Sequence, residues 1–541
     1  MKRLLVNTLS CLLALELAAC GGDSGSGDSN GTSNPPSSPP PSTGTHDVTT
    51  YKYDQNRGGW NAVETVLTPA NVTSGTFGKI LTLPTDNRVD AAPLYLAQLP
   101  VGGSTRNVLY VATENDSVYA FDADTGATLW QVSLLNGESA SDTRGCSQVT
   151  PQIGITSTPV IDRTAGAIYV VAMTLDNTGK YHQRLHALST TSGAELANSP
   201  RDIMASFGTT SFDPGQYEER AALLLNNGTI YTAWTSHCDN PPYGGWIIAF
   251  NQSSLAQTAA LNVAPGASGT GYASQGPAIW MSGGGPGADP AGNVYLLTGN
   301  GRFETSLNAG FPSGGDYGNS FLKLSLSGST LGVADYFTMW NEVSESQSDQ
   351  DLGSGGEMLL PDMTDSDGTT RRLLVGAGKD GNLYVVDRDS MGKFDPTTNH
   401  IWQELDGALP GGVWSTPAYA NGTVYYGPAG NALRAFTVTS ARLSSAPASR
   451  TAVSFPYPGS SPSVSSNGAS NGIVWAYRNS SPAALYAYDA SDLSRELYDS
   501  NQAANGRDQF GGANKFVTPV VANGKVFVAT PDGVAVFGLL Q

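Results

Sequence analysis

Basic side chains are scarce in this chain. Lys and Arg together number 28 in 541 residues, against 46 Asp and Glu, and the formal net charge is −18 at pH 7. A surface with this balance repels the phosphates of nucleic acids and of anionic lipids. The composition therefore argues against nucleic acid and anionic membrane surfaces as partners.

Cysteine is almost absent as well, with four in the whole chain. Cys11 falls in an N-terminal signal and Cys20 directly follows it as the expected site of lipidation, which leaves Cys146 and Cys238. In an oxidising compartment a remaining pair is more often a disulfide than a metal site. We therefore predict a bond between Cys146 and Cys238, with two unpaired thiols as the alternative.

Several catalytic motifs are missing. The sequence has no Gly-x-Ser-x-Gly elbow, no His-Glu-x-x-His, no P-loop and no Cys-x-x-Cys-His for covalent haem. His182 and His186 would share one face of a strand, but no third metal ligand is near them in the sequence. The Asp cluster at 362–367 lacks the Glu that a calcium loop requires, and we interpret it as a solvated turn.

The first residues have the pattern of an export signal. Residues 1–19 carry two basic residues, an apolar stretch too short to span a bilayer, and small residues that lead to Cys20. This is typical of a bacterial lipoprotein signal, in which Cys20 is lipidated after cleavage. An ordinary signal or a retained membrane helix is the alternative. Residues 20–47, rich in Gly, Ser and Pro, predict a tether that cannot fold.

The remaining residues, 48–541, are predicted to form a single domain, and the signal predicts a location in the bacterial cell envelope. The protein would be held to a membrane by its lipid anchor only, and would face the periplasm or the outer surface.

What the chain has in quantity is a repeated apolar pattern. A run of the form "small, Val/Ile, Tyr/Phe, Val" is followed eight times by a turn and a second alternating run. The copies lie at 108–122, 167–189, 229–251, 293–325, 372–387, 423–437, 472–489 and 525–538. Units that cannot bury their own faces must stack, and four-stranded units arranged radially make a β-propeller.

A short apolar segment, usually with Pro near its start, precedes each copy and is expected to form the innermost strand. These segments lie at 92–97, 158–162, 221–225, 276–281, 358–362, 416–420, 461–465 and 518–522. The last copy lacks an outer strand, whereas Phe77 to Pro84 resembles an outer strand without a blade. We predict an all-β, eight-bladed propeller of four-stranded antiparallel blades that this N-terminal strand closes.

The middle third resembles a known family. The runs GNVYLLTGN (292–300), SDQDLGSGGEMLLPD (348–362) and LLVGAGKDGNLYVVDRDSMGKF (373–394) are similar to the corresponding part of the quinoprotein dehydrogenases. These are eight-bladed propellers that hold pyrroloquinoline quinone and calcium on the axis. The resemblance is loose from about residue 50 to 541 and good over 283–394.

The resemblance implies roles for five residues. Asn300 closes a strand as the family's calcium-ligating Asn does, and Asp351 stands where the family has its catalytic Asp, which also ligates calcium. Lys379, in a Lys-Asp-Gly turn, matches the basic residue that contacts the quinone. Asp176 replaces a family Glu as a metal ligand and is one methylene shorter, and Trp280 is the candidate for the Trp on which the quinone rests.

The implied chemistry is the oxidation of a small alcohol or sugar. Calcium would polarise a quinone carbonyl, Asp351 would accept the proton of the substrate hydroxyl, and the cofactor would carry the redox step. Two alternatives remain, because fold does not imply function. One is a non-catalytic binding or outer-membrane assembly scaffold whose partner is an envelope protein, and the other is a glycan-active hydrolase or lyase.

Overall fold

The computed structural model describes residues 47–241, 244–267 and 276–540. The described residues belong to one compact unit. The predicted signal peptide, Cys20 and nearly all of the predicted tether lie outside the described residues. Within the described part of the chain, no helix has the length and apolar character needed to cross a membrane.

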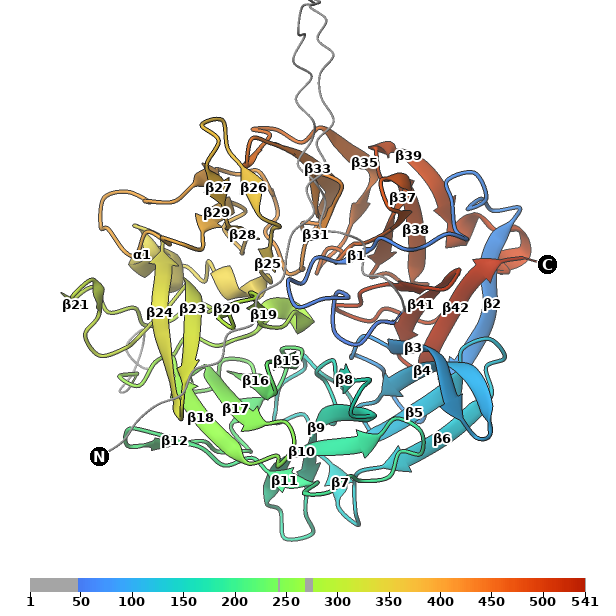
Figure 1. Ribbon diagram of the computed structural model, residues 1–541, viewed down its shortest axis with the longest axis horizontal. Coiled ribbons are helices and arrows are strands. Elements are labelled where there is room, and N and C mark those ends of the chain that lie inside the picture. The colour runs from blue at the N-terminus through green and yellow to red at the C-terminus, as the bar shows by residue number, and fades with distance from the viewer. Residues whose placement is uncertain (1–46, 242–243, 268–275, 541) are drawn as a thin grey trace, which may run out of the picture. The chain divides into compact units, whose positions relative to one another are not determined.

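Eight four-stranded antiparallel blades form a ring, as predicted (Figure 1). From the inside outwards, the first four blades are β3 (Leu94–Val101), β4 (Ser104–Ala112), β5 (Ser117–Asp122) and β6 (Thr128–Ser133); β8 (Val160–Asp162), β9 (Ala167–Leu175), β10 (Tyr181–Ser189) and β11 (Arg201–Asp202); β15 (Leu224–Asn226), β16 (Thr229–Ser236), β17 (Trp246–Asn251) and β18 (Gln257–Asn262); and β19 (Gly287–Ala288), β20 (Val294–Leu297), β23 (Ser320–Ser327) and β24 (Thr330–Thr338).

The other four blades are β25 (Met358–Leu359), β28 (Leu373–Gly376), β29 (Leu383–Asp387) and β30 (Gln403–Leu405); β31 (Ala418–Ala420), β32 (Thr423–Tyr426), β33 (Asn431–Thr439) and β35 (Ser449–Phe455); β36 (Ser463–Asn467), β37 (Ser470–Arg478), β38 (Ala484–Asp489) and β39 (Asp492–Asp499); and β40 (Val520–Ala522), β41 (Lys525–Thr530), β42 (Gly533–Leu539) and β2 (Phe77–Pro84).

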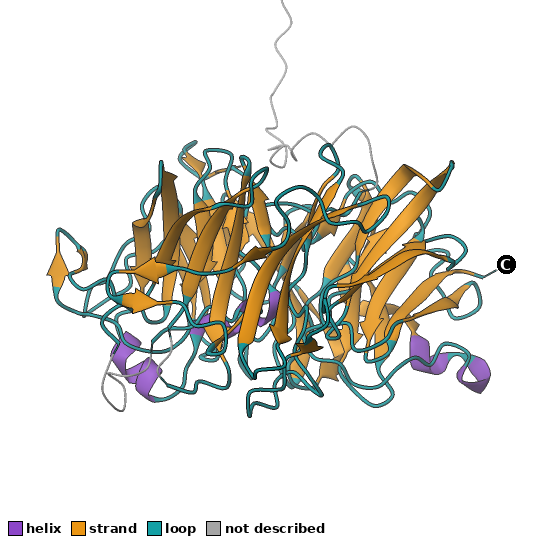
Figure 2. Cartoon of the chain, turned by 90° about the horizontal axis from the view of Figure 1, so that it is seen from below, coloured by secondary structure: helices purple, strands orange, loops and turns teal. Residues whose placement is uncertain are grey.

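Short elements decorate the loops between these strands. They are β1 (Trp60–Asn61), β7 (Ser139–Ala140), β12 (Ser206–Phe207), β13 (Thr210–Ser211), β14 (Tyr217–Glu218), β21 (Leu307–Asn308), β22 (Phe311–Pro312), β26 (Met363–Thr364), β27 (Thr370–Arg371), β34 (Arg442–Leu443), α1 (Glu342–Gln347), η2 (Met281–Gly283), η3 (Leu352–Ser354), η4 (Ser500–Gln502) and η5 (Ala504–Gly506). Figure 2 shows the helices towards one face of the ring.

Burial follows the position of each strand in its blade. The third strand β5 is buried along its whole length, whereas the outermost strand β6 is half-buried or exposed throughout. A blade stacks on a neighbour at each face, so its middle strands carry apolar residues on both sides. This explains why the repeat shows continuous apolar runs in the middle strands.

The predicted ring closure is confirmed. β2 pairs antiparallel with β42, from Phe77 opposite Leu539 to Pro84 opposite Gly533. The Phe77 ring packs edge-on against Tyr498 of the neighbouring blade, with ring centres 4.9 Å apart. The N-terminal strand therefore completes the last blade and removes its open edge.

The prediction of one inner strand is wrong. Residues 276–281 do not form the first strand of the fourth blade, and β19 at Gly287–Ala288 takes that place. The glycine-rich stretch before β19 lets the chain pass another blade, because a Cβ on Gly285 would lie 2.3 Å from the carbonyl oxygen of Ala222. The other seven inner strands begin within the predicted segments.

An unpredicted feature runs along the axis. Residues 47–61, here called the axial segment, contact the inner part of every blade (Figure 1). The backbone or side-chain hydrogen bonds join Val48 to Tyr95, Thr49 to Ile161, Arg57 to Leu223, Gln55 to Ala288, Asn56 to Leu359, Gly58 to Tyr419, Gly59 to Val464 and Asn61 to Val521. The axial segment therefore fills the channel at the level of the inner strands.

Candidate functional site

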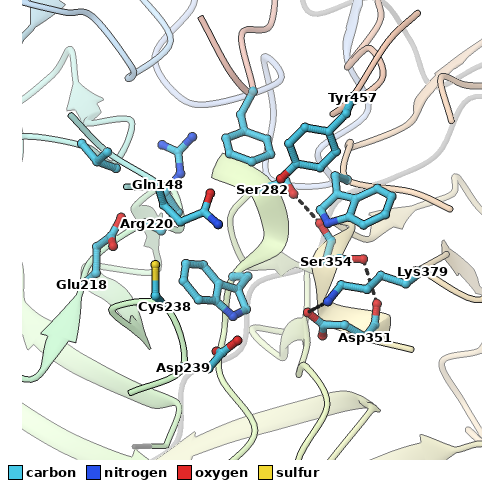
Figure 3. Close-up of a pocket in the computed structure, with 14 residues that line it drawn as sticks. Gln148, Glu218, Arg220, Cys238, Asp239, Ser282, Asp351, Ser354, Lys379 and Tyr457 are labelled. Carbon is cyan, nitrogen blue, oxygen red and sulfur yellow. Dashed lines mark hydrogen bonds and ion pairs between the residues drawn. The ribbon is translucent and has the colours of Figure 1, made fainter. Parts of the chain in front are cut away.

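A pocket opens on the channel at the end where the inner strands begin. It contains about 620 Å³ of space free of protein atoms, part of it open to solvent. Most of its residues lie in loops just before inner strands, so seven blades contribute to it. The lining residues are Gln148, Val149, Glu218, Arg220, Cys238, Asp239, Trp280, Ser282, Asp351, Ser354, Lys379, Trp414, Tyr457 and Phe516 (Figure 3). We call it the axial pocket.

Three glycines let the loops around Asp351 come together. A Cβ on Gly299 would lie 2.6 Å from Oδ1 of Asp351, and one on Gly378 would lie 2.4 Å from its carbonyl oxygen. A Cβ on Gly353 would lie 2.5 Å from the nitrogen of Gly299. Each glycine belongs to one of the three runs that resemble the quinoprotein dehydrogenases, so those motifs have a direct geometric meaning here.

Asp351 is the most constrained carboxylate of the axial pocket. Its side chain is 6% exposed, its Oδ1 accepts a 2.9 Å hydrogen bond from the backbone N–H of Asn300, and its Oδ2 lies 3.8 Å from Nζ of Lys379. Burial raises the pKa of Asp351 to about 6, although the Lys379 charge opposes the shift and Asp239 adds to it. The carboxylate therefore exchanges its proton close to neutral pH.

Lys379 remains a cation beside it. Its Nζ donates a 2.7 Å hydrogen bond to Oδ1 of Asp349, a side chain that is 70% exposed. Burial lowers the pKa of Lys379, but the charges of Asp351, Asp349 and Asp239 together outweigh burial and raise it. The ammonium group can thus hold a nearby anion without losing its proton.

Two other predicted residues stand apart from the pocket lining. Asn300 reaches the site through its backbone, and its Nδ2 donates a 3.1 Å hydrogen bond to Asp349. Asp176 is not among the lining residues, because it lies in the turn between β9 and β10. Its Oδ1 accepts from the backbone of Thr178 and Lys180, and its Oδ2 lies 3.0 Å from Nε2 of His182.

Asp239 is the acidic residue that sequence reasoning missed. It follows the second strand of the third blade, as Asp176 follows that of the second blade, but the same count one repeat later reaches Cys238, one residue before it. Asp239 lines the axial pocket, and its charge contributes to the raised pKa of Asp351. The two carboxylates therefore share one electrostatic environment.

Trp280 lines the axial pocket on a strained turn. The next two residues, Met281 and Ser282, have φ values of 47° and 50°, which side chains other than glycine rarely adopt. The Ser282 hydroxyl donates to the carbonyl oxygen of Ser354, which fixes this turn to the loop of Asp351. Strain held in this way by surrounding contacts is frequent at ligand sites.

Further aromatic rings surround the space. Trp414 and Tyr457 meet edge to face with their ring centres 5.3 Å apart, and Phe516 lies beside Arg220. They were not predicted, since a single aromatic residue before an inner strand carries no local signal. Flat faces of this kind suit a planar ligand.

The predicted disulfide is confirmed. Cys146 and Cys238 are bonded across 92 residues, with their Cα atoms 5.5 Å apart. The bond ties the loop that carries Gln148 and Val149 to the loop that carries Asp239. Two walls of the axial pocket are thereby fixed to one another.

Metal ligands are not gathered in this conformation. In the ranges 47–241, 244–267 and 276–540, no three His, Cys, Asp or Glu side chains form a group that could hold a metal ion. His186, like His182, is engaged by a carboxylate, with Nδ1 2.6 Å from Glu195. The site as described offers a buried base, a cation and aromatic faces.

Comparisons with known proteins agree on the fold. A family model described as outer membrane protein assembly factor BamB matches residues 86–230. The quinohemoprotein alcohol dehydrogenase of Comamonas testosteroni superposes with a TM-score of 0.61 at 14% identity, covering 91% of this chain and 80% of that one. A europium-containing methanol dehydrogenase gives 0.58 at 13% identity, covering 91% and 98%.

A second quinohemoprotein alcohol dehydrogenase, from Pseudomonas putida HK5, gives a TM-score of 0.58 at 14% identity, covering 91% of this chain and 80% of that one. At these identities the likeness establishes the fold alone. A search of curated proteins by sequence finds no match.

Proposed function

We propose that this chain, a propeller of the PQQ-type fold, binds an ortho-quinone such as pyrroloquinoline quinone in its axial pocket and oxidises an alcohol or sugar. The observation that carries the proposal is Asp351, a buried carboxylate with a pKa of about 6, oriented by Asn300 and placed beside Lys379. A group of this kind is a suitable general base near neutral pH.

The lining residues fit such a cofactor. Pyrroloquinoline quinone is planar and carries carboxylates, and the axial pocket presents the rings of Trp280 and Trp414 together with the cation Lys379. Aromatic faces favour a flat conjugated ligand, and a buried ammonium favours carboxylate or quinone oxygens. These three residues are the ones that would hold the cofactor.

The protein's own part in the reaction is proton handling. Above pH 6 Asp351 is ionised and can accept the proton of a substrate hydroxyl. The backbone N–H of Asn300 holds Oδ1 of Asp351 in place, and Lys379 remains positively charged. A bound quinone would supply the redox chemistry, taking up two electrons and two protons as the alcohol becomes a carbonyl compound.

Calcium fits this conformation less well. Of the predicted ligands, Asp351 lines the axial pocket, Asn300 reaches it by its backbone, and the carboxylate of Asp176 is engaged in a hairpin turn. In this conformation the three predicted ligands therefore do not converge on one point.

The test is cofactor binding followed by turnover. Purified protein mixed with pyrroloquinoline quinone and calcium should show a bound-quinone absorption band. Asp351→Asn should retain the band and lose about 10²- to 10⁴-fold in turnover, because it removes the base and keeps the shape. Asp389→Asn, at a side chain that is 54% exposed on the surface, is the matched control. A wild-type protein that binds no quinone would overturn the proposal.

A second candidate is a non-catalytic scaffold in the cell envelope. The match of residues 86–230 to the assembly-factor family supports it. A scaffold would use its exposed loops and would not need the base at Asp351. Absence of quinone binding, together with capture of an outer-membrane assembly protein equally well by wild type and Asp351→Asn, would favour this candidate.

We also propose lipidation at Cys20 and attachment to an envelope membrane through that lipid. Mass spectrometry of the protein from membranes tests it. A Cys20→Ala variant should appear in the soluble fraction.

A further inference from the structure

One wall of the axial pocket holds a guanidinium group without a carboxylate partner. Arg220 is 4% exposed and lines the pocket. Its Nη1 donates a long 3.4 Å hydrogen bond to the carbonyl oxygen of Thr156, and its Cζ lies 4.9 Å from the ring centre of Phe516. Among the residues that the structure describes, it forms no ion pair. The charge of Arg220 acts on the buried carboxylate of Glu219 without a direct ion pair. An anionic ligand would supply the direct partner that this buried guanidinium lacks.

Glu218 presents an unsatisfied acceptor on the same wall. Its side chain is 1% exposed, and neither carboxylate oxygen has a hydrogen-bond partner. Nδ1 of His237 lies 3.4 Å from its Oε2, beyond normal hydrogen-bond length. A buried acceptor left without a donor is costly, and a ligand hydroxyl would satisfy it.

A second basic side chain, Lys515, lies near Arg220. Burial lowers the pKa of Lys515, and the next largest cause is the positive charge of Arg220. The ammonium of Lys515 lies 3.5 Å from Oε1 of Gln148, at the edge of the same wall. Two cations that repel one another at a pocket wall attract an anion between or beside them.

We propose that this wall, formed by Gln148, Glu218, Arg220 and Phe516, is a subsite for a hydroxy acid. Arg220 binds the carboxylate of the ligand, and Glu218 accepts a hydrogen bond from its hydroxyl. Figure 3 shows Glu218 and Arg220 on the side of the pocket opposite Asp351 and Lys379. This inference deepens the proposed function, since it names polyhydroxy carboxylates as the substrate class of the same pocket.

Binding titrations test the subsite without turnover. D-gluconate should bind the wild-type protein at least about tenfold more tightly than neutral D-glucose, because a charge-assisted pair is added. Arg220→Gln should remove this difference, and Arg220→Lys should keep part of it. Glu218→Gln removes a negative charge from the wall and leaves a weaker, neutral acceptor, so the preference for gluconate over propionate, which has no hydroxyl, should fall. Arg201→Gln, at an exposed arginine outside the pocket, is the matched control.

The anion could also come from the cofactor, and the same variants separate the two sources. If Arg220→Gln weakens pyrroloquinoline quinone about tenfold and leaves gluconate unchanged, the subsite belongs to the cofactor and the substrate assignment is overturned. Equal binding of gluconate and glucose by the wild type also overturns it. A protein that binds gluconate through Arg220 but takes up no quinone would leave this inference standing while the proposed function falls.

Discussion

The backbone N–H of Asn300 donates a 2.9 Å hydrogen bond to Oδ1 of Asp351, 51 residues further along the chain. The bond joins the end of a strand in the fourth blade to the loop before the fifth. It leaves Oδ2 of Asp351 for Lys379 and for a ligand. The position of the proposed base is thus set by contact between blades and not by its own loop alone.

The proposed base predicts a pH profile. The pKa of Asp351 is raised to about 6, so the carboxylate is protonated and inactive below that value. We expect kcat/KM for an alcohol to rise tenfold per pH unit below pH 6 and to level off above it. The measurement is the initial rate of the quinone-loaded protein between pH 4.5 and 8. A flat profile would exclude Asp351 as the base.

The raised pKa of Asp351 also predicts how the stability of the protein depends on pH. The folded-state pKa lies above the ordinary value of 3.8. Between about pH 4 and 6 the folded protein therefore keeps this proton while the unfolded chain has lost it. The free energy of unfolding falls as pH rises through this range. Asp351→Asn cannot ionise. We expect it to be more stable than wild type at pH 8, by up to about 3 kcal/mol, and equally stable at pH 4.

Urea unfolding at the two pH values measures this difference. The same gain in stability at pH 4 and pH 8 would show that packing, and not ionisation, is its cause.

Ring closure can be tested by removing its strand. Deleting residues 77–84 leaves β42 paired with β41 only and exposes its outer edge, so we expect a lower melting temperature and aggregation. Circular dichroism and light scattering report the two effects. Thr82→Ala, which retains the strand, is the control. A deleted protein that melts cooperatively at the wild-type temperature would refute the role of β2.

The axial segment can be tested at Arg57. Its side chain is fully buried and donates to the carbonyl oxygens of Gly285, Pro286 and Leu223. Arg57→Met should destabilise the protein by at least about 2 kcal/mol, because it leaves several buried carbonyl groups without donors. Guanidinium unfolding provides the measurement, with Arg201→Met as the control. A loss below about 0.5 kcal/mol would mean that the segment is dispensable.

Local sequence patterns predicted the repeated blades and the site residues that lie within a motif. The eight blades follow from the apolar runs, and Asp351, Lys379 and Trp280 line one pocket because their motifs carry the glycines that let the loops approach. Asp176 illustrates the limit. The count along the second blade reaches Asp176, which lies outside the pocket, whereas Asp239 after the second strand of the third blade lines it.

Other features have no local signal at all. Glu218 and Arg220 stand in no motif, and their importance comes from burial without partners, which depends on neighbours from other blades. Residues 276–281 look like an inner strand but leave the sheet, because glycines nearby allow a closer approach to the third blade. The axial segment has no recognisable pattern in the sequence, since its partners are spread over all eight blades.

The axial segment also has a kinetic consequence. It is synthesised before all eight blades, yet its partners extend to Val521, and β2 must wait for β42. Neither contact can form until the last blade has been synthesised. Contacts of such high sequence separation fold slowly and leave edges exposed meanwhile. Synthesis of the last blade, and not the folding of any earlier one, is therefore the step that allows the exposed edges of the ring to pair.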